Sequence, residues 1–190
     1  MPSPIGHGLA GLAIGLAAEP ALIAQSAGRR LTRYAVLGAL FAALPDADLL
    51  YAPMHRGVTH SIGATALLMI VTAGVTGWVT GRIQWRWVWL IGAAHATHIA
   101  LDWMATDRYP PPGLEALWPF SHKFYISGWD VFPPTERRVY LPRAVLTNLR
   151  AFIAEVGLMG PVAALVFIVK RTRRNRVPTS ARDGLQRPSA

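Results

Sequence analysis

The chain has 190 residues, of which 52% are hydrophobic and only 15% are charged; it carries a net charge of +9 and no cysteine. Average soluble domains have about 25% charged residues, so this chain has too little charge to cover an ordinary globular surface. The lack of cysteine excludes disulfides and thiolate metal ligands, which leaves His and carboxylate side chains for any metal. We expect one domain, with residues 1–176 embedded in a membrane and residues 177–190 forming a disordered basic tail.

Five apolar segments are predicted, and each of the first two contains a proline break. Residues 4–27 are rich in Gly and Ala, which allows close helix packing, and Pro20 is expected to end or kink their helix. Residues 34–50 contain only about 12 uncharged residues in a row, fewer than a full span needs. Because Pro45 disfavours helix in the residues before it, we expect PDAD at 45–48 at a helix end or turn.

The remaining segments are long enough to cross a membrane. Residues 62–81 have no charged side chain, and residues 87–106 begin in a belt of Trp residues and end with ionisable ones. Residues 107–148 are rich in Pro and aromatic residues, which predicts an ordered loop with short helices. Residues 151–169 form the fifth segment, with Glu155 inside it. We therefore expect an all-α, multi-pass membrane helical bundle with a Pro/aromatic-rich loop between its fourth and fifth segments.

Basic residues lie beside three of the apolar segments, in groups at 29–33, 82–86 and 170–176. High basicity can indicate nucleic-acid binding. This placement is instead typical of the positive-inside rule, so we expect the lipid bilayer as the partner and no nucleic acid. A bacterial-type inner membrane protein with five segments and a cytoplasmic tail would then carry its His and Asp residues at the outer face. In this orientation the basic residues within 107–148 would lie on the outer side, which the positive-inside rule does not favour.

Five His and Asp residues in apolar surroundings are the predicted metal ligands: His7, Asp46, His60, His98 and Asp102. Such side chains are costly in an apolar chain unless something binds them, and a divalent metal is a common remedy. Asp102 follows His98 by four residues, so a helix places both on one face. Five donors exceed the needs of one tetrahedral zinc, whereas two ions that share a carboxylate would use them all.

Neighbouring polar residues have predicted supporting roles. Asp46 would position or deprotonate an attacking water, with Asp48 behind it, and Arg56 would hold an anionic substrate through its planar guanidinium. Thr59 and Ser61 suit helix capping or hydrogen bonds to ligands. The helix that begins after them offers backbone N–H groups to an anion.

These residues also have plainer interpretations. His98 and Asp102 can form a simple hydrogen-bonded pair, and the PDAD carboxylates can merely shape a turn. His7 can be a buried histidine with a local partner. Arg56 can pair with a local carboxylate, and His55 can be an exposed loop histidine, which is the interpretation we favour for His55.

Five short motifs follow one another over most of residues 5–120: GH at 6–7, LPDAD at 44–48, HRGVTHS at 55–61, HxxxD at 98–102 and LWPF at 117–120. In this order and spacing the chain resembles the YdjM family of membrane-bound, predicted metal-dependent hydrolases. The family runs quickly from HxxxD to LWP, whereas this chain has the longer stretch TDRYPPPGLEALWPF. The resemblance implies a membrane-bound hydrolase that depends on metal.

A remoter likeness is to the zinc-dependent phospholipase C and P1 nuclease superfamily. These all-α enzymes use a helical HxxxD, a His near the N-terminus, and an Asp followed about fourteen residues later by a His, as Asp46 is by His60 here. The likeness implies that Asp102 bridges two metals and that Asp46 binds metal or positions water. For later His and Glu ligands of that superfamily, His122 and Glu155 are candidates only by residue type.

The function predicted from these patterns is metal-dependent hydrolysis at the membrane surface, on a phosphoester of a lipid or lipid-linked substrate. The divalent metal is expected to be Zn²⁺, which would supply an activated water. The alternative is a non-catalytic membrane metal-binding or transport component, whose ionisable residues would be staggered through the membrane instead of gathered at one level. A structural metal that ties short helices together is a third interpretation.

Overall fold

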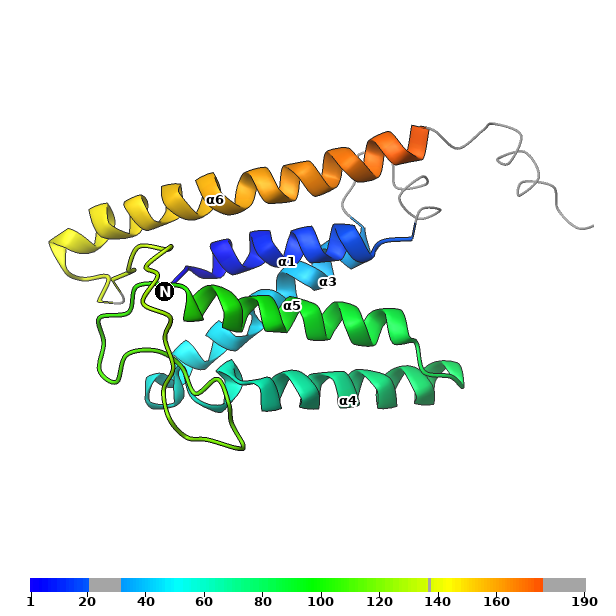
Figure 1. Cartoon of the computed structure of the whole chain (residues 1–190), viewed down its shortest axis with the longest axis horizontal. Helices are drawn as coiled ribbons and strands as arrows, with labels where there is room; N and C mark the ends of the chain where they lie inside the picture. The colour runs from blue at the N-terminus through cyan, green and yellow to red at the C-terminus, as the bar shows by residue number, and fades with distance from the viewer. Residues whose placement is uncertain (21–31, 137, 176–190) are drawn as a thin grey trace, which may run out of the picture.

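The computed structural model describes residues 1–20, 32–136 and 138–175, and the secondary structure of these residues is helical apart from two isolated β-bridges (Figure 1). The α-helices of this part of the chain are α1 (Pro4–Ala18), α3 (Arg33–Ala43), α4 (Ile62–Thr80), α5 (Trp85–Trp103) and α6 (Pro142–Asn175). Between α3 and α4 lie two 3-10 helices, η1 (Leu44–Met54) and η2 (Val58–His60). The predicted all-α class is confirmed for the described residues.

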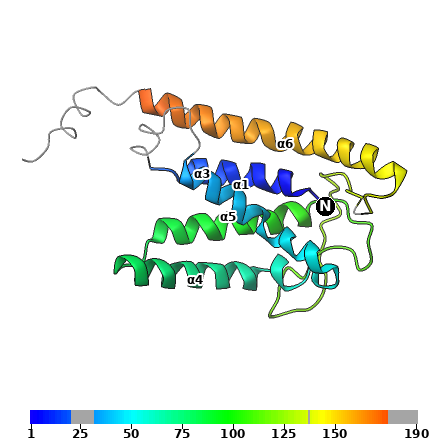
Figure 2. The same ribbon diagram turned by 180° about the vertical axis from the view of Figure 1, so that it is seen from behind.

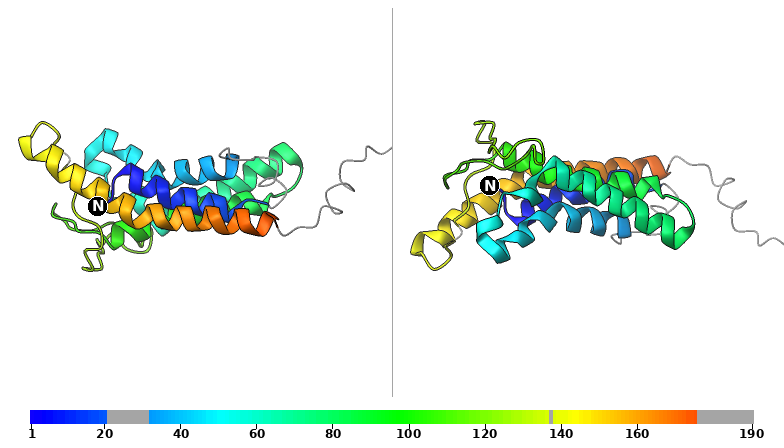
Figure 3. Two further views of the ribbon diagram at one scale, coloured as in Figure 1. Left: turned by 90° about the horizontal axis from the view of Figure 1, so that it is seen from above. Right: turned by 90° about the horizontal axis from the view of Figure 1, so that it is seen from below.

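The helices form an elongated bundle with α5 at its centre. α5 contacts α1, α3 and α4, while α6 packs along α1. Figures 1 and 2 show α6 and α4 on opposite outer sides of the bundle, and Figure 3 shows α6 running along α1. α4 and α6 therefore lie on the outer sides of the bundle, and α1, α3 and α5 lie between them.

Small residues bring α1 and α3 into backbone contact. A methyl group at Gly11 would lie 2.1 Å from the carbonyl oxygen of Gly38, and one at Gly15 would lie 2.2 Å from that of Tyr34. No side chain fits at either position, so the two helices pack this closely only because glycine is there. The close packing predicted for the first apolar segment is therefore confirmed over α1.

The two predicted proline breaks coincide with helix ends. α1 ends at Ala18, shortly before Pro20, and residues 21–31 lie outside the described structure. α3 ends at Ala43, and the chain continues as the 3-10 helix η1, which contains the PDAD run. The prediction of a helix end next to Pro45 is confirmed, because the chain changes from α to 3-10 geometry there.

Two described helices are long and apolar enough to cross a membrane. They are α4, with mean hydropathy 1.8 and no buried residue, and Pro142–Thr172 of α6, with mean hydropathy 2.2 and few buried residues. The core helix of a soluble protein hides its apolar side chains, whereas these helices expose residues such as Trp78 and Leu165. The five predicted segments are not confirmed as five spans, since α1 and α3 have only 15 and 11 residues and a span needs about 20.

The segment between α5 and α6 is an ordered loop. Its described residues contain no helix, so the short helices predicted for 107–148 are not found, and α6 begins inside that range at Pro142. The prolines of the loop lack the N–H donors that a helix would need. Two isolated bridges link parts of the loop, namely Ala105 with Phe132 and Leu114 with Tyr125.

The two ends of the bundle differ in chemistry. The first residues of α1, the start of α4, the end of α5 and the loop meet at the end marked N in Figure 1. The turn between α4 and α5, which contains Arg82, and the end of α6, which contains Lys170 and Arg171, lie at the other end. The fold therefore separates the His and Asp residues from these basic residues along the helix axes.

Candidate metal centre

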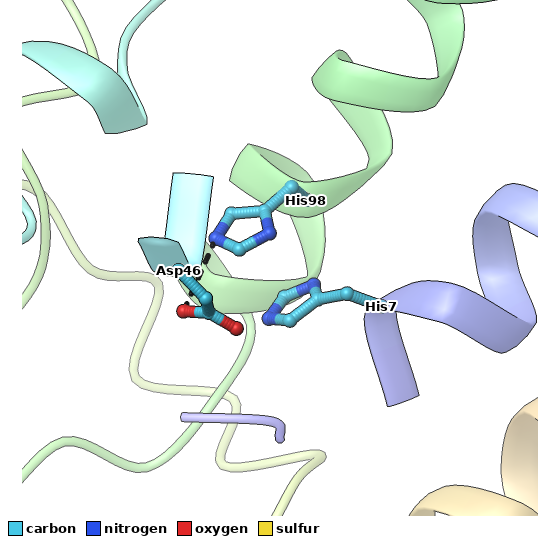
Figure 4. A group of neighbouring side chains, drawn as sticks. All are labelled: His7, Asp46 and His98. Carbon is cyan, nitrogen blue, oxygen red and sulfur yellow. Dashed lines mark ion pairs between the residues drawn. The ribbon is translucent and has the colours of Figure 1, made fainter. Parts of the chain in front are cut away.

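Four elements meet at the loop end of the bundle, and each contributes a predicted ligand. His7 lies in the first turn of α1, Asp46 in η1, His60 in η2, and His98 and Asp102 in the last two turns of α5. Figure 4 shows His7, Asp46 and His98 pointing toward one another from three of these elements. The three His side chains have no exposed surface, and the exposed fractions of Asp102 and Asp46 are 1% and 9%. The structure thus brings all five residues together.

Asp102 lies at the centre of this cluster. Its Oδ1 is 3.3 Å from His7 Nε2, and its Oδ2 is 3.3 Å from His98 Nε2 and 3.5 Å from His60 Nε2. Asp46 Oδ1 approaches two of the same imidazoles, at 3.9 Å from both His60 Nε2 and His98 Nε2. Two carboxylates therefore face three imidazoles across a small volume.

The facing atoms are not satisfied by the protein itself. The Nε2 atoms of His7, His60 and His98 and both carboxylate oxygens of Asp102 are buried and make no hydrogen bond within the described structure. Their separations of 3.3–3.5 Å are longer than ordinary N–H···O hydrogen bonds. Two atoms bound to one tetrahedral zinc at about 2.0–2.1 Å lie about 3.4 Å apart. The residues therefore fit a divalent metal held by imidazole and carboxylate.

The hydrogen bonds around the imidazoles set their orientation. His98 Nδ1 donates to the carbonyl oxygen of Ala42 at 2.7 Å, which leaves its Nε2 facing the cluster. His60 Nδ1 contacts Thr59 Oγ1 at 3.0 Å and Asp48 Oδ2 at 3.2 Å, which turns its Nε2 inward in the same way. Burial lowers the pKa of His60, so the ring is neutral near pH 7, as a metal ligand must be. Partners of this kind commonly orient histidine ligands in metal sites.

Asp48 lies behind the cluster and holds two imidazoles. Its carboxylate contacts His55 Nδ1 at 2.5 Å and accepts a hydrogen bond from the Thr59 hydroxyl, in addition to its contact with His60. Burial by itself would raise the pKa of Asp48, but the hydrogen bonds from His55, His60 and Thr59 outweigh it and hold that pKa well below its usual range. Asp48 is therefore an anion that positions His55 and His60.

His55 is closer to the cluster than the sequence interpretation allowed. It is nearly buried, its ring centroid is 5.1 Å from that of His60, and its ligand atom lies within 4.8 Å of those of Asp46 and His60. The chain turns between the two histidines at Arg56, whose φ is 68°. The exposed-loop interpretation favoured for His55 is therefore wrong, and the signal that could have found it is the repeated His within HRGVTHS.

Arg56 has a different environment from the one predicted. Its guanidinium forms an ion pair with Asp107 and donates to the carbonyl oxygens of Tyr109 and Gly113 at 3.2 and 3.3 Å. The alternative of a carboxylate partner fits this arrangement, although Asp107 is 51 residues away and not the local partner expected. The predicted contact with a substrate anion stays a prediction. Arg56 instead ties the turn between η1 and η2 to the loop, since its own carbonyl accepts from Glu115 N at 2.9 Å.

The start of α4 is closed by the loop. Ser61 Oγ accepts from Ala64 N at 3.0 Å, so its predicted capping role is confirmed. The N–H groups of Ile62 and Gly63 donate to the carbonyls of Ala116 and Trp118, the latter in the LWPF motif. The N–H groups predicted to receive an anion are therefore already paired within the chain, which corrects that expectation.

The remaining ionisable candidates lie outside the cluster. His95 Nδ1 contacts Thr65 Oγ1 at 2.8 Å, and the largely exposed His122 contacts Glu115 at 3.0 Å. Glu155 is fully buried on α6 and accepts hydrogen bonds from the backbone N–H, at 2.7 Å, and the hydroxyl of Ser3, the residue before α1. None of these three belongs to the groups whose atoms could share one ion.

Three overlapping groups of described residues have ligand atoms within 4.8 Å of one another: His7, Asp46 and His98; Asp46, His55 and His60; and His60, His98 and Asp102. A family model described as YdjM inner membrane protein matches residues 1–175, which include all of these groups. No curated protein and no solved structure matches the chain, so the likeness to the phospholipase C and P1 nuclease superfamily stays a prediction. With the motifs, the exposed apolar helices and this match in agreement, the chain belongs to the YdjM inner membrane protein family.

Proposed function

We propose that this protein is a metal-dependent hydrolase at the membrane surface that cleaves a phosphoester of a lipid or lipid-linked substrate. The observation that carries the proposal is the convergence of His7, His60 and His98 on Asp102, with buried atoms that lack hydrogen bonds. The donor set of imidazole and carboxylate suits Zn²⁺, and the overlapping ligand groups suit two ions. Bound there, such ions lower the pKa of a water toward neutrality and stabilise negative charge on a phosphoryl oxygen.

The roles of the chain's own residues follow from their places. Asp102 faces all three imidazoles and is the natural shared ligand. Asp46 is the least buried member of the cluster, so it is best placed to accept a proton from water as the water oxygen attacks phosphorus and the ester oxygen leaves. Asp48 keeps His55 and His60 in position for this step.

A lipid substrate is favoured by the place of the cluster in the bundle. The cluster lies at the loop end, where Phe120 and Trp129 expose 85% and 63% of their surface, as aromatic residues at a membrane interface do. We further propose that this end faces outward and that the basic end faces the cytoplasm. The exposed Arg82 and Arg86 and the basic end of α6 suit that orientation under the positive-inside rule.

Two other functions are weighed by the same geometry. An ion path would need ionisable residues staggered through the bundle, whereas the described His and Asp ligands gather at one end, which argues against transport. A structural metal is the second candidate, because His7, His60, His98 and Asp102 are almost completely buried. A structural site is closed to substrate, and a catalytic one keeps an open position.

Metal analysis coupled to a phosphoester panel separates these functions. The purified protein should contain zinc or another divalent metal, and Asp102→Asn should lose most of it, while the exposed loop variant Asp130→Asn should keep it. The metal-loaded protein should hydrolyse at least one phosphoester, with lipids included in the panel, and the metal-free protein should not. Bound metal without any hydrolysis would favour the structural site, and a protein that binds no metal would refute both.

A further inference from the structure

An apolar groove lies between α4 and α5. Its volume is about 520 Å³, within the roughly 300–1,000 Å³ typical of small-molecule sites. Ile62 and Met69 line it from α4, Ala96, Ala100 and Trp103 from α5, and Leu117 from the loop. The room exists because Ala96 and Ala100, one turn apart on α5, are small and exposed where larger residues would fill the space.

The groove is continuous with the surface that faces the membrane. α4, one of its walls, has no buried residue and is apolar enough to span a bilayer. Its exposed residues include Leu67 and Ile70, beside the groove-lining Met69 on the same helix. In a membrane, the molecules that reach such a groove are therefore the tails of lipids.

The groove and the metal cluster share α5 as a wall. Ile99 lines the groove, whereas His98, the residue before it, belongs to the cluster. Thr65 lines the groove from α4, and its hydroxyl contacts His95 Nδ1, one turn before His98, at 2.8 Å. The loop joins the two features as well, since Ala116 lines the groove and its carbonyl accepts from the first N–H of α4, next to the cap that follows His60.

We propose that this groove holds one acyl chain of the phosphoester lipid whose headgroup is cleaved at the metal cluster. The inference rests on the proposed function and adds to it the part of the substrate that is recognised. Lipid tails are as apolar as the groove, so the groove gains little from the hydrophobic effect. Its contribution is to fix the position of the chain, and hence of the phosphoester, relative to the cluster.

Photo-crosslinking tests occupancy without relying on catalysis. The probe is a phosphatidylglycerol with a diazirine near the end of one acyl chain, at low mole fraction in phosphatidylcholine nanodiscs that hold the full chain. Labelling of the groove segments of α4 and α5 should exceed labelling of the exposed face of α6 several-fold. Ala100→Phe, which fills the groove, should remove this excess. Equal labelling of the groove and α6, or labelling that Ala100→Phe does not change, would overturn the proposal.

The matched control is Ala93→Phe, an identical change on the same helix. Ala93 is also exposed, but it lines a different hollow, beside Trp89 and Ile14. This variant should keep the excess labelling of the α4–α5 groove. Loss of labelling in both variants would show that a bulky residue anywhere on α5 disturbs the fold, and Ala96→Ile, a smaller change inside the groove, would then have to lower the labelling for the proposal to stand.

Hydrolysis assays separate failure of the groove from failure of the proposed function. Ala100→Phe should lower kcat/KM for a long-chain phosphoester lipid by roughly tenfold or more, because a misplaced phosphoester reacts slowly. It should leave hydrolysis of a short, water-soluble phosphoester unchanged. An equal loss on both substrates would overturn the groove proposal but leave the hydrolase standing. A wild-type protein that labels in the groove but cleaves no phosphoester would refute the hydrolase and leave a lipid-binding groove.

Discussion

At the loop end of the bundle, His7, His60 and His98 are wholly buried, whereas at the other end Arg82 and Arg86 are exposed. Exposed basic side chains keep their hydration and need no partner. Buried imidazoles and carboxylates lose hydration, and the Nε2 atoms of the three imidazoles and both oxygens of Asp102 do not regain it through hydrogen bonds within the described structure. The difference indicates that the basic end affects orientation in the membrane, whereas the buried cluster at the loop end is suited to binding a ligand.

The orientation of the two ends gives the largest expected contrast, because labelling from one side of a membrane is nearly all-or-none. The chain has no cysteine of its own, so single cysteines report cleanly. An impermeant thiol reagent applied to intact spheroplasts should label Lys123→Cys in the loop and should not label Ser180→Cys in the tail. Both should react after lysis. The reverse pattern in intact spheroplasts would invert the proposed topology.

Removal of metal should have the next largest effect, and this effect should arise only at the metal cluster of the loop end. Without an ion, the buried Asp102 carboxylate faces three imidazoles with no hydrogen bond to either of its oxygens within the described structure, and an uncompensated buried charge costs about 3–5 kcal/mol. A chelator should therefore lower the Tm of the wild-type protein in detergent by many degrees. The same chelator should barely shift the Tm of Asp102→Asn. If the chelator left the Tm of the wild-type protein unchanged, no metal would be stabilising this end of the bundle.

A pair of histidines sharpens the contrast between buried and exposed positions. His98→Ala removes a ligand and leaves the Ala42 carbonyl without its donor, so we expect a loss of about 3 kcal/mol in the free energy of unfolding. His122 is 74% exposed and its ring contacts Glu115, so His122→Ala should change stability by about 0.5 kcal/mol or less. Denaturant unfolding in detergent measures both. Similar losses in the two variants would count against a special role for the cluster.

The smallest effect is expected from the ion pairs of the loop, near the start of α6. Hydrogen bonds from the Arg138 and Tyr109 side chains lower the pKa of Glu136 to about 2 from its usual 4.5. A depressed carboxyl pKa stabilises the folded state above pH 4.5, and the benefit disappears as the pH falls toward 2. Glu136→Gln should therefore lower the Tm slightly at pH 6, and the difference from wild type should vanish over that range. A difference that persists at pH 2 would show that the carboxylate charge is not its cause.

Local patterns in the sequence predicted much of the candidate site. The four-residue spacing of His98 and Asp102 placed both on one helix face, and Pro45 marked a helix end. Both follow from backbone geometry over a few residues, so they could be predicted without knowing what packs nearby. The convergence of the five ligands was inferred from their chemistry, since buried polar groups need partners.

The features that the sequence could not show depend on contacts between distant parts of the chain. Arg56 pairs with Asp107, and the start of α4 is closed by carbonyls of the loop more than fifty residues away. Counting apolar residues could not show which segments span a membrane, because length and exposure depend on where helices end and what they pack against. His55 lies next to the cluster because the chain turns at Arg56, which its exposed-loop interpretation did not include.

The sequence by itself determined the helical class, the apolar surface and the set of side chains that need a partner, because these follow from composition and short-range spacing. Only the tertiary structure decided which of those side chains meet, how Asp48 and Ala42 orient the imidazoles, and that a groove runs beside them on α5. The reason is that hydrogen bonds and cavities arise between elements far apart in the chain, and no local pattern specifies both of the partners.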